Sequence, residues 1–112
     1  MKKRTVYISG PMTGLPDHNF PAFNAAATDL RNLGFCVFNP AEISVGKPND
    51  YETSQDFYHA CLRADVKGLC DCDILALMPG WENSSGAHLE LHIAHRLGVE
   101  IFNVADLLKG VS

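Results

Sequence analysis

The feature that most constrains the fold is a regular alternation of short apolar runs with segments of helical periodicity. The runs are rich in β-branched and aromatic residues and are bounded by turn signals, which is typical of strands; they occupy residues 5–9, 35–38, 73–78 and 99–102. Elsewhere apolar residues recur every three or four positions, which predicts helices; these cover residues 21–33, 54–69, 86–97 and 105–109. The chain therefore repeats strand and helix four times.

Strands that are apolar on both faces are expected where helices cover both sides of a parallel sheet. The order therefore predicts an α/β fold, a three-layer α/β/α sandwich of the flavodoxin- or Rossmann-like kind with four or five parallel strands. A length of 112 residues leaves room for a single domain, which we place at 1–112. Ligands of such sheets bind beyond the carboxyl ends of the strands. The site should lie there, and the aperiodic segment 41–52 is predicted to be a binding loop or lid.

Charge and composition exclude several functional classes. The net charge is −4 and residues 2–4 form the only basic block, which argues against a nucleic-acid polymer as partner. No apolar run approaches the ~20 residues that span a bilayer, and Gly10 follows the basic start too soon for a signal-peptide core. We therefore expect a cytoplasmic protein that binds no membrane. We read the cysteines as reduced core residues rather than metal ligands or disulfides; they are Cys36, Cys61, Cys70 and Cys72.

Glu90 is the residue whose position points most directly to chemistry. At 100° per residue it lies in the middle of the buried face of the 86–97 helix, about one turn from its start. Burial favours the protonated carboxyl group, whereas the helix dipole favours the ionised one. A partly desolvated carboxylate that stays charged suits a nucleophile or a base. The alternative is a glutamate bonded to the backbone or to a tyrosine for structure alone.

Three histidines occupy the opposite face of the same helix. His88, His92 and His95 share that face, so Glu90 cannot join them around a metal ion, and their spacing differs from the HExxH pattern. We expect this face to be solvated or to form an interface. We also expect neither a metal ion nor a cofactor.

Two further carboxylates are candidates for catalysis. Asp65 interrupts an otherwise apolar stripe of the 54–69 helix, and Asp73 begins the third strand. Both are expected near the amino ends of the strands, away from the site, and this placement argues against each as a catalytic residue. For Asp73, a capping role is an equal alternative.

Two loops offer small residues and backbone donors. One follows the first strand and consists of Ser9, Gly10, Pro11 and Met12. The other begins the 86–97 helix, where Ser84, Ser85 and Gly86 suit a phosphate or a sugar hydroxyl but also an ordinary helix cap. Trp81 precedes this second loop and suits either stacking on a base or a subunit contact.

A combination of segments spans nearly the whole chain: residues 6–12 (VYISGPM), 19–24 (NFPAFN), 39–42 (NPAE), 63–65 (RAD), 73–77 (DILAL), 79–82 (PGWE), 85–90 (SGAHLE) and 98–101 (GVEI). This combination resembles the nucleoside 2-deoxyribosyltransferase-like family, and in particular a small prokaryotic and phage subgroup. The resemblance implies N-glycosidic bond cleavage or transfer on 2′-deoxynucleosides or deoxynucleoside 5′-monophosphates.

The resemblance also implies roles for individual residues. Glu90 would attack the anomeric carbon and form a covalent sugar–enzyme intermediate, which is the two-step retaining logic of glycosidic chemistry. Tyr7 would orient Glu90, and the nearest match to the family's proton-donating aspartate is Asp73 or Asp65. Residues 10–12 would line the base pocket.

Some alternatives stay open at this point. Ser84 stands where the family commonly carries an aspartate, and related deoxynucleotide N-hydrolases hold a 5′-phosphate with serines near this loop, so the small-molecule partner is a nucleoside or a nucleotide. Transfer and hydrolysis are both compatible with the residues. A non-catalytic nucleotide-binding module and a ribonucleotide phosphoribohydrolase are alternatives on the same fold. The family's sites are often completed by a neighbouring subunit, which implies a homo-oligomer.

Overall fold

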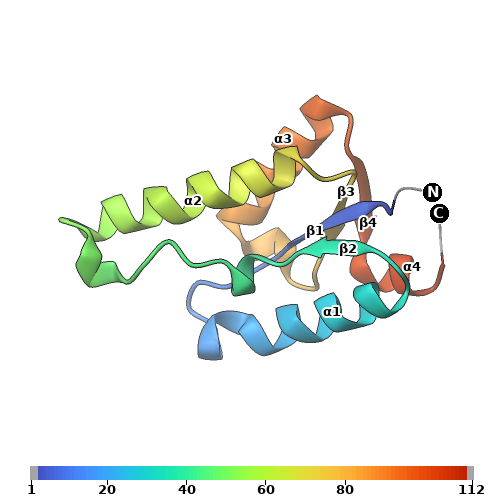
Figure 1. Ribbon diagram of the computed structural model, residues 1–112, viewed down its shortest axis with the longest axis horizontal. Helices are drawn as coiled ribbons and strands as arrows, with labels where there is room; N and C mark the ends of the chain where they lie inside the picture. Colours follow the sequence, from blue (N-terminus) through green and yellow to red (C-terminus); the bar gives the residue numbers. More distant parts are fainter. Residues whose placement is uncertain (1–2, 111–112) are drawn as a thin grey trace.

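The computed structural model describes residues 3–110 and builds them around a parallel sheet (Figure 1). The strands are β1 (Thr5–Ser9), β2 (Cys36–Phe38), β3 (Ile74–Leu77) and β4 (Glu100–Asn103). Their spatial order is β2-β1-β3-β4, and each neighbouring pair is parallel. After β1 the chain crosses to one side of the sheet and after β3 to the other. The crevice at the carboxyl ends of β1 and β3 is therefore the switch point where such sheets bind ligands.

Helices cover both faces of the sheet. Figure 1 shows α1 (Phe20–Asn32) and α2 (Ser54–Cys70) on opposite sides of it. The short α4 (Val104–Leu108) packs on the same face as α1, and α3 (Ser85–Leu97) on the same face as α2. Short 3-10 turns complete the loops: η1 (Pro16–Asn19), η2 (Pro40–Glu42), η3 (Pro48–Asp50) and η4 (Trp81–Asn83). The predicted three-layer α/β/α sandwich with a parallel sheet is thus confirmed.

Two buried clusters form the core, one on each face of the sheet. Val6 and Ile8 of β1 point towards α1 and α4, whereas Tyr7 belongs to the cluster beneath α2 and α3. This division follows from the strand period of two, which sends alternate side chains to opposite faces. The same period places Ser9 on the face of Tyr7. Tyr7 and Ser9 therefore point to the same side of the sheet, near the carboxyl end of β1.

The outer strands are less buried than the sequence predicts. Runs 35–38 and 99–102 are apolar like the central strands, but Cys36 and Glu100 are exposed and their neighbours are only partly buried. Both strands lie at the edges of the sheet, where helices cover them incompletely. Leu97, which shares the predicted buried face of α3, is 55% exposed, because it ends the helix beside the left-handed Gly98.

The reading of the cysteines as core residues is wrong for two of them. Cys72 is buried and Cys61 is half-buried, as apolar surroundings imply, but Cys36 and Cys70 are exposed. Cys36 begins an edge strand, and Cys70 is the last residue of α2. All four thiols are free.

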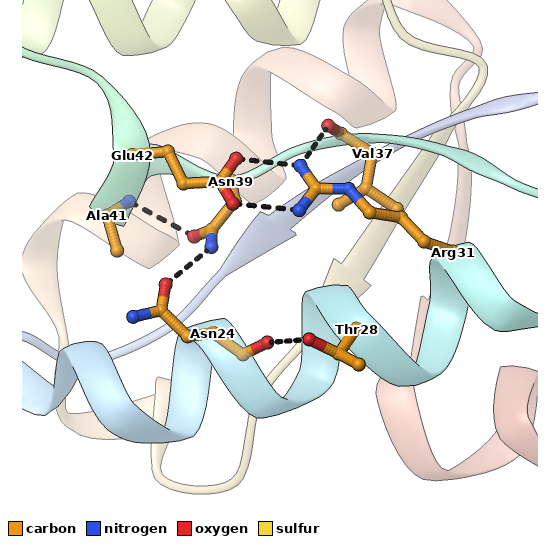
Figure 2. A network of polar contacts seen from close by, with 7 residues as sticks. All are labelled: Asn24, Thr28, Arg31, Val37, Asn39, Ala41 and Glu42. Carbon is orange, nitrogen blue, oxygen red and sulfur yellow. Dashed lines mark hydrogen bonds and ion pairs between the residues drawn. The ribbon is translucent and has the colours of Figure 1, made fainter.

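A polar network holds the chain where it leaves β2 (Figure 2). Asn39 is 1% exposed; its side-chain oxygen accepts from the Ala41 backbone N–H at 3.1 Å, and its amide donates to Asn24 of α1 at 2.9 Å. Arg31 donates to both carboxylate oxygens of Glu42 at 2.7 Å. These contacts tie the start of the segment after β2 to α1, so the segment enters the site region from a defined point.

Helix α2 is much longer than the strands it covers. It has 17 residues, about 25 Å at 1.5 Å per residue, whereas β3 has 4 residues, about 13 Å at 3.3 Å per residue. It begins with Thr53, whose hydroxyl accepts from the Asp56 N–H at 3.0 Å. Figure 1 shows its first half extending beyond the carboxyl edge of the sheet. This projection forms one wall of the site.

Within residues 3–110, the longest and most apolar helical stretches still fall short of what a bilayer crossing requires.

Candidate active site

Glu90 lies at the carboxyl end of β1 and is bonded through both of its carboxylate oxygens. It is 7% exposed. The Tyr7 hydroxyl donates to Oε2 at 2.5 Å, and the Ser9 hydroxyl donates to Oε1 at 2.6 Å. Hydroxyl bonds to a carboxylate of this length are charge-assisted. The predicted burial of Glu90 and the prediction that Tyr7 orients it agree with this geometry, and the bond from Ser9 adds a second fixed point.

The electrostatics of Glu90 reflect a balance of opposing causes. Burial raises its pKa, while the hydrogen bonds from Ser9 and then Tyr7 act in the other direction. Burial and the charge of Glu90 together raise the pKa of Tyr7 far above its usual range, so this phenol stays a donor. The net result is a raised pKa of Glu90, with burial as the largest cause. A desolvated carboxylate is suited to act as a nucleophile in its ionised form.

Asp65 is the second carboxyl group of the site. It is partly buried, and its pKa is raised to about 7, first by burial and then by the negative charge of Glu90. When two carboxyl groups lie close together, their negative charges repel, and the state in which one is protonated and the other is ionised is favoured. Near neutral pH this arrangement can supply one ionised and one protonated carboxyl group, the pair that glycosidic chemistry uses.

The position of Asp65 corrects the expectation that it lies at the amino end of the sheet. It lines the same cavity as Glu90. The expectation treated the helix as no longer than the strands, whereas α2 projects beyond them. Asp73 does lie at the amino end: its carboxylate accepts from the Thr5 backbone N–H at 3.0 Å, and it lines a separate surface depression with Arg4 and Glu100. The structure thus brings Asp65, but not Asp73, to Glu90.

A cavity of about 850 Å³ opens above Glu90. Its walls come from the loop after β1, the segment after β2, the first half of α2 and the start of α3. The predicted substrate-binding residues that line it are Ser9, Gly10, Pro11, Met12, Ser84, Ser85 and Gly86. Trp81 is absent from this lining; its ring packs 5.2 Å from that of His88 and against the cluster beneath α2 and α3.

Local packing explains two of the small residues in these loops. A Cβ on Gly10 would lie 2.6 Å from Cβ of Met78, so only glycine lets the first loop pass this close to the end of β3. Ser84 caps α3, because its hydroxyl accepts from the Ala87 N–H at 3.1 Å. That bond accounts for Ser84 structurally, while Ser85 and Gly86 line the cavity at the start of the helix.

Sequence reasoning missed several residues of the cavity wall. His18 comes from the turn before α1, and Phe20 is the first residue of α1. Ile43 lies in the segment 41–52, which was predicted to be a binding loop or lid and does line the cavity, although the residue itself was not singled out. Phe57 and Tyr58 come from the projecting half of α2. Tyr58 lies on the same helical stripe as Asp65, and this was the one sequence signal that could have placed it in the cavity wall. The turn at His18 has no readable pattern, because its backbone conformation is unusual for the residues it contains.

The outer face of α3 carries the three histidines. His88, His92 and His95 are exposed, and His88 Nε2 lies 2.7 Å from the Glu82 carbonyl oxygen. Within residues 3–110, the side chains of His, Cys, Asp and Glu form no group of three that could hold a metal ion.

Comparison with known proteins places this chain in a family. The family described as "Domain of unknown function (DUF4406)" matches residues 4–103. The chain belongs to this family. A solved structure of a 2-deoxyribosyltransferase from the psychrotolerant bacterium Bacillus psychrosaccharolyticus is similar with a TM-score of 0.69 and 22% identity, covering 87% of this chain and 69% of that one. That enzyme is described as a biocatalyst for the synthesis of nucleosides. Curated protein sequences contain no match.

The match to the family and the likeness of the structures agree with the resemblance seen in the sequence. The fold is that of a 2-deoxyribosyltransferase, and the prediction of a nucleoside 2-deoxyribosyltransferase-like fold is confirmed. At 22% identity the likeness concerns the arrangement of the chain.

Proposed function

We propose that the protein cleaves or transfers the N-glycosidic bond of 2′-deoxynucleosides, with Glu90 as the nucleophile. One observation carries the proposal: a buried carboxylate, held through both oxygens by Tyr7 and Ser9, lies beneath a cavity large enough for a small molecule. Cavities of about 300–1,000 Å³ commonly hold small-molecule ligands. The similarity in fold to a nucleoside-processing enzyme supports the same substrate class.

The first step is attack by a Glu90 oxygen on C1′ of the sugar. The new C1′–O bond forms as the C1′–N bond breaks, and the base leaves with the bonding electron pair. Each carboxylate oxygen accepts one hydrogen bond and keeps a further lone pair, so neither Tyr7 nor Ser9 blocks the attack. Both bonds fix the carboxylate in one orientation, which lowers the entropy that the attack must lose.

Asp65 is the group we assign as proton donor to the leaving base. Its pKa of about 7 leaves much of it protonated at neutral pH, and it lines the cavity together with Glu90. In the second step water or an acceptor base attacks C1′ from the face that the first base left. The ionised Asp65 takes the proton of the attacking group, and the C1′–O bond to Glu90 breaks with its electrons returning to the carboxylate.

The charge of the cavity favours an uncharged nucleoside over a nucleotide. Among the described residues that line it, none is a lysine or an arginine, while two carry carboxyl groups. A phosphate would lie in the field of Asp65 and Glu90 without a strong cation to balance it. A deoxynucleoside 5′-monophosphate is the second candidate, since Ser85 and Gly86 line the cavity at the start of α3, and the amino end of a helix favours a phosphate.

The direct test is incubation with the common 2′-deoxynucleosides and their 5′-monophosphates, with and without an added acceptor base. Chromatography then measures free base and exchanged nucleoside. We expect Glu90→Gln to abolish turnover and Asp29→Asn, at an exposed position of α1 outside the cavity, to leave it unchanged. Acid quenching followed by mass spectrometry should find one deoxyribosyl group on the unaltered protein and none on Glu90→Gln. Turnover that survives Glu90→Gln would rule out the assigned nucleophile.

Self-association belongs to the same proposal. Large apolar side chains stay exposed near the cavity, among them Phe20 at 36%, Ile43 at 43% and Tyr58 at 54%. A second copy of the chain over this region would shield them and exclude water from the reaction. Light scattering coupled to gel filtration gives the mass in solution; a mass of one chain at working concentration would contradict this part.

A further inference from the structure

An unusual turn precedes α1. Asp17, His18 and Asn19 follow one another with φ of 52°, 54° and 60° and ψ of 30°, 26° and 16°. These are left-handed conformations, which residues with a Cβ adopt rarely and as single residues rather than in series. Three in succession are a local strain, and such strain persists only where the surrounding structure enforces it.

Hydrogen bonds within the loop between β1 and α1 hold this turn in place. The Asn19 side-chain amide donates to the Pro11 carbonyl at 3.0 Å, and the His18 backbone N–H donates to the Leu15 carbonyl at 3.0 Å. Leu15 in turn donates its N–H to Met12 at 3.2 Å. The turn is thereby fastened to residues that themselves line the cavity. Its effect is to present the His18 ring at the cavity wall, beside the ring of Phe20.

His18 differs in chemistry from the rest of that wall. Its ring centroid lies 5.7 Å from that of Phe20, with the planes tilted by 46°. Among the described residues lining the cavity it is the sole histidine, and it stands between apolar groups: Met12 and Phe20 on its own side, Phe57 on α2 across the cavity. An imidazole can both donate and accept a hydrogen bond in the plane of its ring. Flat apolar walls with one such group suit a planar heteroaromatic ring.

We propose that His18 binds the nucleobase of the substrate, with an imidazole nitrogen bonded to the edge of the base and Phe20 against its face. This inference rests on the proposed function, because it assumes that the ligand is a nucleoside. The proposal also explains why the strained turn is kept. Glycine would adopt this conformation without strain, but it has no imidazole to bind the base. His18 is thus a residue that determines which base is accepted.

Two glycine variants of the same turn test the inference. His18→Gly and Asp17→Gly each relieve one left-handed residue. Both residues are exposed, but only His18 lines the cavity. We expect both to raise Tm by a few degrees, about what relief of one strained residue gives in a domain of this size. Only His18→Gly should weaken nucleoside binding, by about tenfold or more, because it removes one hydrogen bond to the base together with the contacts of the ring.

Binding is measured by calorimetry with the four common 2′-deoxynucleosides in a Glu90→Gln background, where no turnover consumes the ligand. A fall in Tm with His18→Gly would show a structural role and overturn the inference, as would equal losses of affinity in both variants. Absence of binding by all four nucleosides also overturns it. If the unaltered protein turns over no nucleoside but His18→Gly still weakens binding selectively, the glycosidic function falls and the role of His18 stands.

Discussion

The raised pKa of Asp65 makes the stability of the protein depend on pH in a defined direction. The group titrates at about 7 in the folded chain against an ordinary value of 3.8, because of burial and then the charge of Glu90. The folded state therefore holds this proton more tightly than the unfolded state. Its contribution to stability is fully present below about pH 4, the unfolded value, and is lost as the pH rises through about 7.

The magnitude follows from the difference between the two values. At about 1.4 kcal/mol per pKa unit, the shift from 3.8 to about 7 would correspond to about 4 kcal/mol. Asp65 is only partly buried and faces a cavity open to solvent, so screening reduces the effect. We expect a loss of about 2 kcal/mol of unfolding free energy from this group as the pH rises from about 4.5 to about 8.

Urea denaturation at these two pH values measures the loss. Asp65→Asn should remove it, so that the variant gains about 2 kcal/mol relative to the unaltered protein at the higher pH but not at the lower. Asp29→Asn on the exposed face of α1 is the control and should leave the difference between the two pH values unchanged. Glu90→Gln should remove part of it, and the double variant measures the coupling. If the unfolding free energy of Asp65→Asn changed between the two pH values by as much as that of the unaltered protein, the reasoning would be refuted.

Three substitutions test the packing that supports the site. A Cβ on Gly68 would lie 2.3 Å from the Phe38 ring, so Gly68→Ala should cost about 1–2 kcal/mol by denaturation despite its better helix propensity; a gain in stability would contradict the contact. Asn39→Ala removes the bonds of a residue that is 1% exposed and should cost about 2 kcal/mol by the same measurement. Tyr7→Phe removes a donor to Glu90, which raises the pKa of that carboxyl group further, so the acid limb of the pH–rate profile should move to higher pH; an unmoved limb would show that the bond does not act on the ionised nucleophile.

The layers of this protein and the burial of Glu90 could be predicted from short-range patterns. Apolar runs and helical spacing are local properties, and they were sufficient to predict the order of elements and to place Glu90 on the buried face of α3. The alternation along β1 also places Tyr7 and Ser9 on one face. The bond from Ser9 to Glu90 was not predicted, because it depends on the register between β1 and α3, which no local pattern contains.

Other features depend on lengths and surroundings that the chain sets only when it is packed. Asp65 was expected at the wrong end of the sheet because its place depends on how far α2 outruns the strands. Cys36 was read as a core residue because its run resembles the central strands, yet β2 lies at an edge. The left-handed turn at His18 is held by hydrogen bonds within the loop between β1 and α1, and residue types that merely tolerate a left-handed backbone do not predict three such residues in succession.

The overhang of α2 has a consequence for how the molecule moves. Its second half rests on the sheet and ends at the buried Leu69, whereas its first half, with Phe57 and Tyr58, has the segment after β2 as its neighbour and no strand beneath it. Amide hydrogens of the first half should exchange with solvent through local openings whose free energy is well below that of global unfolding. Amide hydrogens near Leu69 should exchange only when the core unfolds. Entry and release of a ligand can then proceed by fraying at one end of a single helix, while Tyr7, Ser9 and Glu90 stay anchored in the slowest-exchanging part of the protein.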